Sequence, residues 1–232
     1  GALLESYAVE MDGKLIAGPS FTTPLGHSDG PGMGCLSCDT SGFAAITNNL
    51  KRNHFSILSQ NIRSLDANFE KFTEFLQQIN EESKYNFLFS VIAMQETWQF
   101  QVKHNIPHYQ KLIARTRSLC NGGGVGFFIR EGIEFEIIEE ASKFIDRVHE
   151  SLFVRLKDKD GRGIIVGNIY RPNTYPYEDK SKSLSLTLSS IDEVRKRYRR
   201  DSIVLVGDFN LDLKSVFEDD KAILFASDSN RK

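Results

Sequence analysis

The chain has 232 residues, 40% of them hydrophobic and 26% charged, with a formal net charge of −2. This balance is that of an ordinary globular chain with a sizeable core. The slightly negative charge argues against tight, non-specific binding of nucleic acid, which needs a basic face. The longest apolar runs have about the length of a strand, so no membrane span is expected. Three cysteines are too few for a disulfide framework, which favours a reducing compartment.

Residues 1–50 differ in composition from the rest of the chain. They are rich in Gly, Ser, Thr and Pro, with one candidate hairpin turning at Asp12-Gly13. They contain neither the basic nor the apolar region of a signal peptide. We therefore predict a largely irregular N-terminal extension over residues 1–50 and one folded domain over residues 51–232.

Apolar runs from residue 54 onward predict strands. These runs cover residues 55–60, 87–95, 124–130, 151–157, 163–170 and 202–209. Several are continuously apolar, as strands buried on both faces are. The mixture of such strands with helical patterns predicts an α/β protein.

Two stretches between these runs show the periodicity of amphipathic helices. In residues 64–79, with Ser64 as the N-cap, one face carries Leu65, Phe69, Phe72, Leu76 and Ile79. In residues 183–198, one face carries Leu184, Leu188, Ile191 and Tyr198. We expect these two faces to pack against the sheet.

Polar residues follow the predicted strands at the points where the strands end. They are Asn61, Glu96, Tyr170, Asp208 and Asn210. Ligands of α/β proteins gather beyond strand ends, so these side chains are expected to converge on one pocket. Taken singly, each is more often a turn residue or a half-buried aromatic residue. The prediction therefore rests on the ordered set.

The types of residue in this set suit phosphodiester hydrolysis. Glu96 can hold Mg²⁺, a hard cation that prefers oxygen ligands and that neutralises phosphate charge. Asp208 can orient and deprotonate an attacking water. Asn61, Asn210 and Tyr170 are neutral donors for a phosphate oxygen that gains charge.

Five ordered segments carry a resemblance to a known family: SQNIRSL, MQETW, GGGVGFFIR, GNIYRPN and VLVGDFN. Over residues 55–213 the chain resembles the endonuclease/exonuclease/phosphatase superfamily, and most closely the endonuclease domain of LINE-type non-LTR retrotransposons. The resemblance implies a DNase-I-like fold, a two-sheet β-sandwich flanked by helices in four αββα layers. It also implies an enzyme that nicks target DNA to expose a 3′-hydroxyl for reverse transcription.

The resemblance assigns roles to the ordered set. It implies that Asn61 and Glu96 lie on the side of a metal, Mg²⁺ or Mn²⁺, and that Tyr170, Asp208 and Asn210 surround the scissile phosphate. The predicted substrate contacts are Arg115, Arg171 and Asn173. The implied partners are DNA and a reverse transcriptase domain on the same parent polypeptide, with no membrane. The expected location is intracellular, in the nucleus when acting on DNA.

The chain departs from the family pattern at its C-terminus. Members end with Ser-Asp-His on a late strand, whereas here Ser227-Asp228 precedes Ser229. We therefore expect the last strand or strands to be missing, and the chain alone to nick DNA only faintly. Residues 23–30 resemble the family's closing stretch, with Gly30 in place of the His. Chance in a Ser/Gly-rich loop is the simpler explanation, and a rearranged chain would make Asp29 the missing carboxylate.

Other motifs have simpler explanations. Cys35 and Cys38 have zinc-knuckle spacing, but no second pair follows. The glycines at 122–124 are not followed by a helix, which favours a loop that needs the conformational freedom of glycine over a phosphate-binding loop.

Arg117 could contact DNA phosphate, but such a residue more often lies on the solvated surface. The basic run at 195–200 is interpreted as a solvated helix end. His104, His108 and His149 have no ligand spacing and are interpreted as surface or core residues.

The hypothesis is thus a Mg²⁺-dependent DNA endonuclease domain. Two alternatives remain open at this point. Phosphoinositide phosphatases and sphingomyelinases share the Glu and Asp-x-Asn core within the same superfamily. A non-catalytic relic or binding module would keep the fold without turnover, and the missing His favours it for this chain.

Overall fold

The computed structural model describes residues 55–83, 87–101, 103–118, 121–157, 163–173 and 177–210. The predictions for residues 1–50, including the hairpin, Asp29 and the cysteine pair, lie outside these residues and stay predictions. The same holds for the C-terminal residues 211–232. The boundary near residue 50 is likewise left as a prediction.

The first sheet is built around a parallel pair of strands. Its order is β1 (Ile57–Asn61), β2 (Val91–Gln95), β4 (Val125–Ile129) and β3 (Ile113–Arg115). β1 and β2 are parallel, and the other neighbours are antiparallel. Parallel neighbours need a crossover, which here contains helix α2 (Leu65–Glu82).

The second sheet ends in another parallel pair. Its order is β5 (Phe135–Ile137), β7 (His149–Lys157), β8 (Gly163–Tyr170) and β9 (Ser202–Asp208), with β6 (Phe144–Ile145) also paired to β7. β8 and β9 are parallel, and helix α3 (Tyr177–Arg197) forms the crossover between them. Within the described residues β9 is an edge strand.

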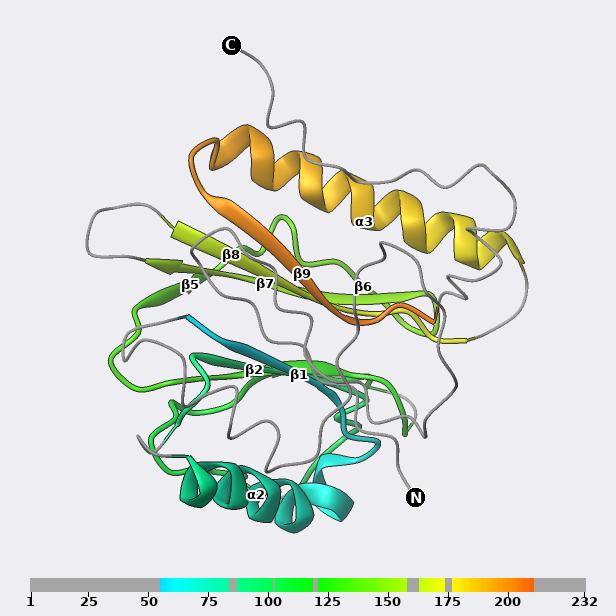
Figure 1. Cartoon of the computed structure of the whole chain (residues 1–232). Helices are drawn as coiled ribbons and strands as arrows, with labels where there is room; N and C mark the ends of the chain where they lie inside the picture. Colours follow the sequence, from blue (N-terminus) through cyan, green and yellow to red (C-terminus); the bar gives the residue numbers. More distant parts are fainter. Residues whose placement is uncertain are drawn as a thin grey trace, which may run out of the picture.

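The two sheets pack face to face, with α2 outside the first and α3 outside the second (Figure 1). Three apolar clusters fill the spaces between these layers. The central one joins both sheets through residues such as Phe127, Val154 and Val166. Leu58, Phe72 and Phe128 belong to the cluster under α2, and Phe153 and Val194 to the cluster under α3. The predicted four-layer αββα sandwich is therefore confirmed.

Helix α2 matches its prediction. The side chain of Ser64 accepts a hydrogen bond from the Ala67 amide at 3.3 Å, which satisfies one of the free donors of the first turn. Leu65, Phe72 and Ile79 are buried, while Phe69 and Leu76 pack partly buried against the same cluster. None of the helices in the described part of the chain combines the length and apolar character that crossing a membrane requires.

Helix α3 packs with a different face from the predicted one. Leu184 and Leu188 are 52% and 39% exposed, whereas Ser183, Thr187, Ser190 and Val194 are buried. The buried polar groups have partners: Ser190 Oγ donates to Ala141 O at 2.7 Å, and Ser183 Oγ contacts His149 Nδ1 at 3.0 Å. The face of α3 that can form hydrogen bonds is therefore buried, in place of the face with the more regular apolar periodicity.

The six predicted strands are all present; β8 has the predicted bounds, and the other five have shifted ends. β2 begins at Val91 although the apolar run begins at residue 87, because Phe87 and Phe89 fill the cluster under α2. The prediction missed β3, β5 and β6. Each has only two or three residues, too few to show an alternating pattern.

Candidate active site

The carboxyl ends of the two parallel pairs supply the candidate site. In the first sheet Asn61 is paired with Gln95, so Glu96 follows directly beside it. In the second sheet Tyr170 is paired with Asp208. β9 delivers Asp208 through a close approach to β8. At Gly207 φ is +134°, and an added Cβ would lie 1.9 Å from the backbone oxygen of Ile169. Only glycine fits there.

Hydrogen bonds join the two sheets at this end. Asn61 Nδ2 donates to Glu96 Oε1 at 2.9 Å and to Asp208 Oδ2 at 2.8 Å. The Tyr170 hydroxyl donates to the same Glu96 Oε1 at 3.1 Å. Four of the five residues predicted to converge thus share one network. It places two carboxylates on either side of a single amide.

Asn210, the fifth residue, lies beside this network. Its backbone amide donates to Asp208 Oδ1 at 3.1 Å, and its Nδ2 donates to Arg171 O at 2.7 Å. Arg171 returns two hydrogen bonds, from Nε to Phe209 O at 2.5 Å and from Nη2 to Asn210 O. These contacts hold the segment after β9, so Asp208 sits on a fixed support.

The electrostatics keep Tyr170 protonated. Burial raises the pKa of its hydroxyl well above the usual value of 10.0, and the charges of Glu96 and Asp208 raise it further. Because the phenol cannot lose its proton near neutral pH, it acts as a hydrogen-bond donor. It can therefore stabilise negative charge at an oxygen atom.

Unusual backbone conformations gather at this end of the sheets. Of the non-glycine residues with positive φ among those described, five flank the network: Arg63, Ser64, Glu96, Trp98 and Asn210. Such conformations persist only where the surroundings enforce them, and they concentrate at functional sites. The backbone of Glu96, with φ of 52°, belongs to this group.

The residues fit a divalent cation. Asn61 Oδ1 is buried and has no hydrogen-bond partner in the described part of the chain. Both donors to Glu96 reach Oε1, which leaves Oε2 for a further ligand. Mg²⁺ is commonly held by one or two carboxylates and completes its shell with water and phosphate oxygens. No group of three or more His, Cys, Asp or Glu side chains occurs in the described residues, so this site would depend on such outside ligands.

The predicted substrate contacts lie in varied surroundings. Arg115 is ion-paired with Glu139 and donates from Nη1 to Ser142 O at 3.1 Å, so its guanidinium is engaged within the protein. Arg171 is buried, which lowers the pKa of its guanidinium against the opposing charge of Asp208. Asn173 is exposed. The structure thus does not bring Arg115 into the network. Arg171 supports the network by holding the segment that follows Asp208.

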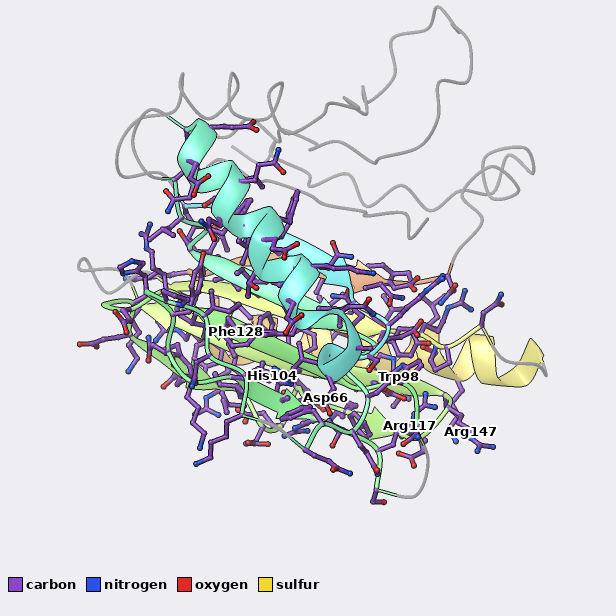
Figure 2. The ribbon with its side chains drawn as sticks, turned by 90° about the horizontal axis from the view of Figure 1, so that it is seen from below. Asp66, Trp98, His104, Arg117, Phe128 and Arg147 are labelled. Carbon is purple, nitrogen blue, oxygen red and sulfur yellow. The ribbon has the colours of Figure 1, made fainter. Side chains whose placement is uncertain are left out.

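Arg117 corrects the expectation of a solvated surface residue. It is 7% exposed and forms an ion pair with Glu150, which is fully buried. In Figure 2, Arg117 and Trp98 are labelled at the same end of the sheets. His149 is a core residue, as expected, and burial lowers its pKa to about 4.

Sequence reasoning missed a polar link behind the site. Asn168 of β8 is fully buried and donates from Nδ2 across the sheets to Met94 O at 2.9 Å and to Gly126 O at 3.0 Å. Gln95 Nε2 donates to Asn168 Oδ1 at 2.6 Å. An amide inside an otherwise apolar strand was the available signal, since a buried amide needs partners. This link fixes how the two halves of the site face each other.

The fold and the site together define a two-sheet α/β protein with a carboxylate pair at the strand ends. A family model described as the Endonuclease/Exonuclease/phosphatase family matches residues 58–217. The chain belongs to this family, as the sequence motifs predicted at superfamily level.

Solved structures of low sequence identity resemble the chain. TDP2 of D. rerio complexed with single strand DNA product is 19% identical, with 71% of this chain and 64% of that chain covered and a TM-score of 0.47. ANGEL2, a 2′,3′-cyclic phosphatase, is 19% identical, with 67% and 52% covered and a TM-score of 0.47. TDP2 of C. elegans is 12% identical, with 83% and 73% covered and a TM-score of 0.49. No curated protein matches the chain.

Proposed function

We propose that this domain is a Mg²⁺- or Mn²⁺-dependent DNA endonuclease of the LINE retrotransposon type. Its membership of the family and the five ordered motifs support a phosphodiester hydrolase. On this proposal it nicks target DNA in the nucleus, and a reverse transcriptase domain of the same parent polypeptide uses the exposed 3′-hydroxyl. One observation carries the proposal: a single amide, that of Asn61, joins Glu96 and Asp208 across two sheets.

The residues of the network can each take a separate role in the hydrolysis. A cation bound at Glu96, beside Asn61, would neutralise charge on the phosphate and on the leaving oxygen. Asp208 accepts a proton from the attacking water, whose oxygen then bonds to phosphorus. The Tyr170 hydroxyl would turn from Glu96 to a phosphate oxygen and stabilise the charge that grows there. Asn61, whose two N–H groups bind Glu96 and Asp208, would hold these carboxylates in place. The bond between phosphorus and the 3′ oxygen breaks, and that oxygen leaves as a hydroxyl by taking a proton from solvent.

The test is nicking of supercoiled plasmid by the full chain with Mg²⁺ or Mn²⁺, beside a phosphoinositide phosphatase assay. We expect faint nicked circles that depend on the metal, and no release of phosphate from lipid. The matched control is Glu96→Gln, which keeps the shape of the side chain and removes its charge. Phosphate release from lipid would replace DNA as the substrate. A chain that binds DNA but does not cut it with either metal would contradict hydrolysis and support a binding module.

A further inference from the structure

A buried carboxylate outside the catalytic network holds the loop beside it. Glu150, at the start of β7, is fully buried, accepts two hydrogen bonds and forms an ion pair. Arg117 donates a hydrogen bond from Nε at 2.5 Å, and its Nη2 completes the ion pair. The backbone amide of Gly124 donates the second hydrogen bond at 2.5 Å. A buried charge is tolerated only when it is paired and hydrogen-bonded. These three groups are called the Glu150 clamp below.

The Glu150 clamp holds the backbone that follows Glu96. The carbonyl of Gly124, whose amide Glu150 binds, accepts a hydrogen bond from Thr97 N at 3.4 Å, and Gly123 O accepts one from Trp98 N at 2.8 Å. On its other side the same segment is bonded to the start of α2, through Ser64 N to Glu96 O at 2.8 Å. The strained backbone at Glu96 is thus fixed between two neighbours.

The glycines of this loop make room for the clamp. A Cβ at Gly123 would lie 2.4 Å from Arg117 Nε, and one at Gly124 would lie 2.4 Å from Thr97 Oγ1. The main chain of Arg117 is also held, since Gln99 Nε2 donates to its carbonyl at 2.7 Å. The GGG motif therefore serves close packing between Arg117 and the Glu96 segment.

The clamp also reaches the other half of the site. Glu150 is the register partner of Tyr170 in the antiparallel pair of β7 and β8. Its carboxylate binds the amide of Gly124, the residue just before β4 of the first sheet, while its backbone pairs with β8 of the second. One side chain thus connects the supports of Glu96 and Tyr170.

We propose that Glu150 and Arg117 are positioning residues, which set the place of Glu96 relative to Tyr170 through the Gly124 amide. The proposal rests on the function proposed above for Glu96 and Tyr170. Support of this kind behind a metal ligand is typically worth about 10- to 100-fold in metal affinity. Misplacement of a reacting group by about 1 Å can cost about 100-fold in rate.

The experiment replaces the clamp by apolar groups of similar volume in the full chain, with Arg117→Met/Glu150→Leu. No unpaired charge remains buried, so the fold is expected to survive. The chain has one tryptophan, Trp98, whose indole Nε1 is buried. We expect a red-shifted Trp98 emission, greater quenching by acrylamide, and Mn²⁺ affinity about 10-fold lower by titration calorimetry. In nicking, kcat should fall about 10-fold or more with KM nearly unchanged.

A rescue variant and a control isolate the role of the Gly124 amide. Arg117→Met/Glu150→Gln keeps a neutral acceptor for that amide and should restore most of the Trp98 signal and of the Mn²⁺ affinity. Arg155→Met/Asp201→Leu removes a similar ion pair at the other end of β8, where Asp201 accepts from Arg155 Nε and from Gly163 N. It should leave Trp98 and Mn²⁺ binding unchanged.

Two outcomes overturn the proposal. One is an unchanged Trp98 signal and Mn²⁺ affinity in a folded Arg117→Met/Glu150→Leu variant, and the other is an equal effect of the control pair. If that double variant does not fold, Arg117→Met/Glu150→Met, whose unbranched side chain follows that of Glu150 more closely, is compared with the same control pair by the same two measurements, with the same criteria. A wild-type chain that binds Mn²⁺ without cutting DNA would refute the proposed function, while the Trp98 measurement would still decide on the clamp.

Discussion

The two ends of β8 carry clamps of the same design with different consequences. At the site end Glu150 binds Arg117 and the amide of Gly124. At the far end Asp201 binds Arg155 Nε at 2.5 Å and the amide of Gly163 at 3.0 Å. Asp201 ties neighbouring strands of one sheet, whereas Glu150 ties the two sheets through the segment that follows Glu96.

The two carboxylates also differ in their ionisation. Burial raises the pKa of Glu150 above its usual value of 4.5, against the opposing effects of the Gly124 amide and of Arg117. At Asp201 burial is outweighed by the hydrogen bonds from Arg155 and Gly163, so its pKa lies below the usual 3.8. Ionisation of Asp201 therefore adds to the stability of the fold, whereas ionisation of Glu150 subtracts from it.

The largest effect is expected from a glycine at the site end. Gly207→Ala places a Cβ against the backbone of Ile169, which cannot move without breaking the pairing of β8 and β9. We expect a loss of about 3 kcal/mol in the free energy of unfolding, measured with urea. Gly132→Ala at the far end meets no atom within 4 Å, and its φ of +82° alone should cost about 1 kcal/mol. Equal losses would show that β9 can shift.

The next effect concerns metal binding. Glu96→Gln removes the only charge on its strand end, so Mn²⁺ affinity should fall about 100-fold in titration calorimetry. Asp201→Asn, at the far end, should leave that affinity unchanged. Equal affinity of Glu96→Gln and the wild type would remove Glu96 as a ligand, and the proposed function with it.

Stability should respond oppositely to neutralising one aspartate at each end. Asp201→Asn weakens hydrogen bonds to Arg155 and Gly163, so unfolding free energy should fall by about 1–2 kcal/mol. Asp208→Asn relieves repulsion between the two carboxylates that Asn61 bridges, and should raise stability by about 0.5 kcal/mol. A loss of stability in Asp208→Asn would mean that the site is not held under charge repulsion.

The smallest effect is a pH dependence of opposite sign at the two ends. The lowered pKa of Asp201 gives a stability contribution that is present above pH 3.8 and lost as the pH falls through the lower folded value. The raised pKa of Glu150 gives a contribution that is present below pH 4.5 and lost as the pH rises through the higher folded value. Urea unfolding of wild type, Asp201→Asn and Glu150→Gln between about pH 3 and 7 measures both. Parallel pH profiles of the two variants would contradict the comparison.

The sequence by itself determined the elements whose signals are local. β1, β4, β7, β8 and β9 follow from apolar runs, and α2 from its Ser64 cap and its periodic face. The ordered residues at the strand ends also predicted which side chains meet. Parallel strands deliver their carboxyl ends to one edge of a sheet, which places Asn61 beside Glu96 and Tyr170 beside Asp208. The packing of the two sheets then joins the two pairs.

Only the tertiary structure decided which groups satisfy one another. The buried face of α3 is set by hydrogen bonds that Ser183 and Ser190 make to residues distant in sequence. Likewise, Arg117 becomes a buried partner of Glu150, and Asn168 a link between the sheets, because each meets its partner across a layer. The cost of burying a polar group depends on whether a hydrogen-bond partner is present at the buried position. Periodicity along the chain does not indicate whether such a partner exists.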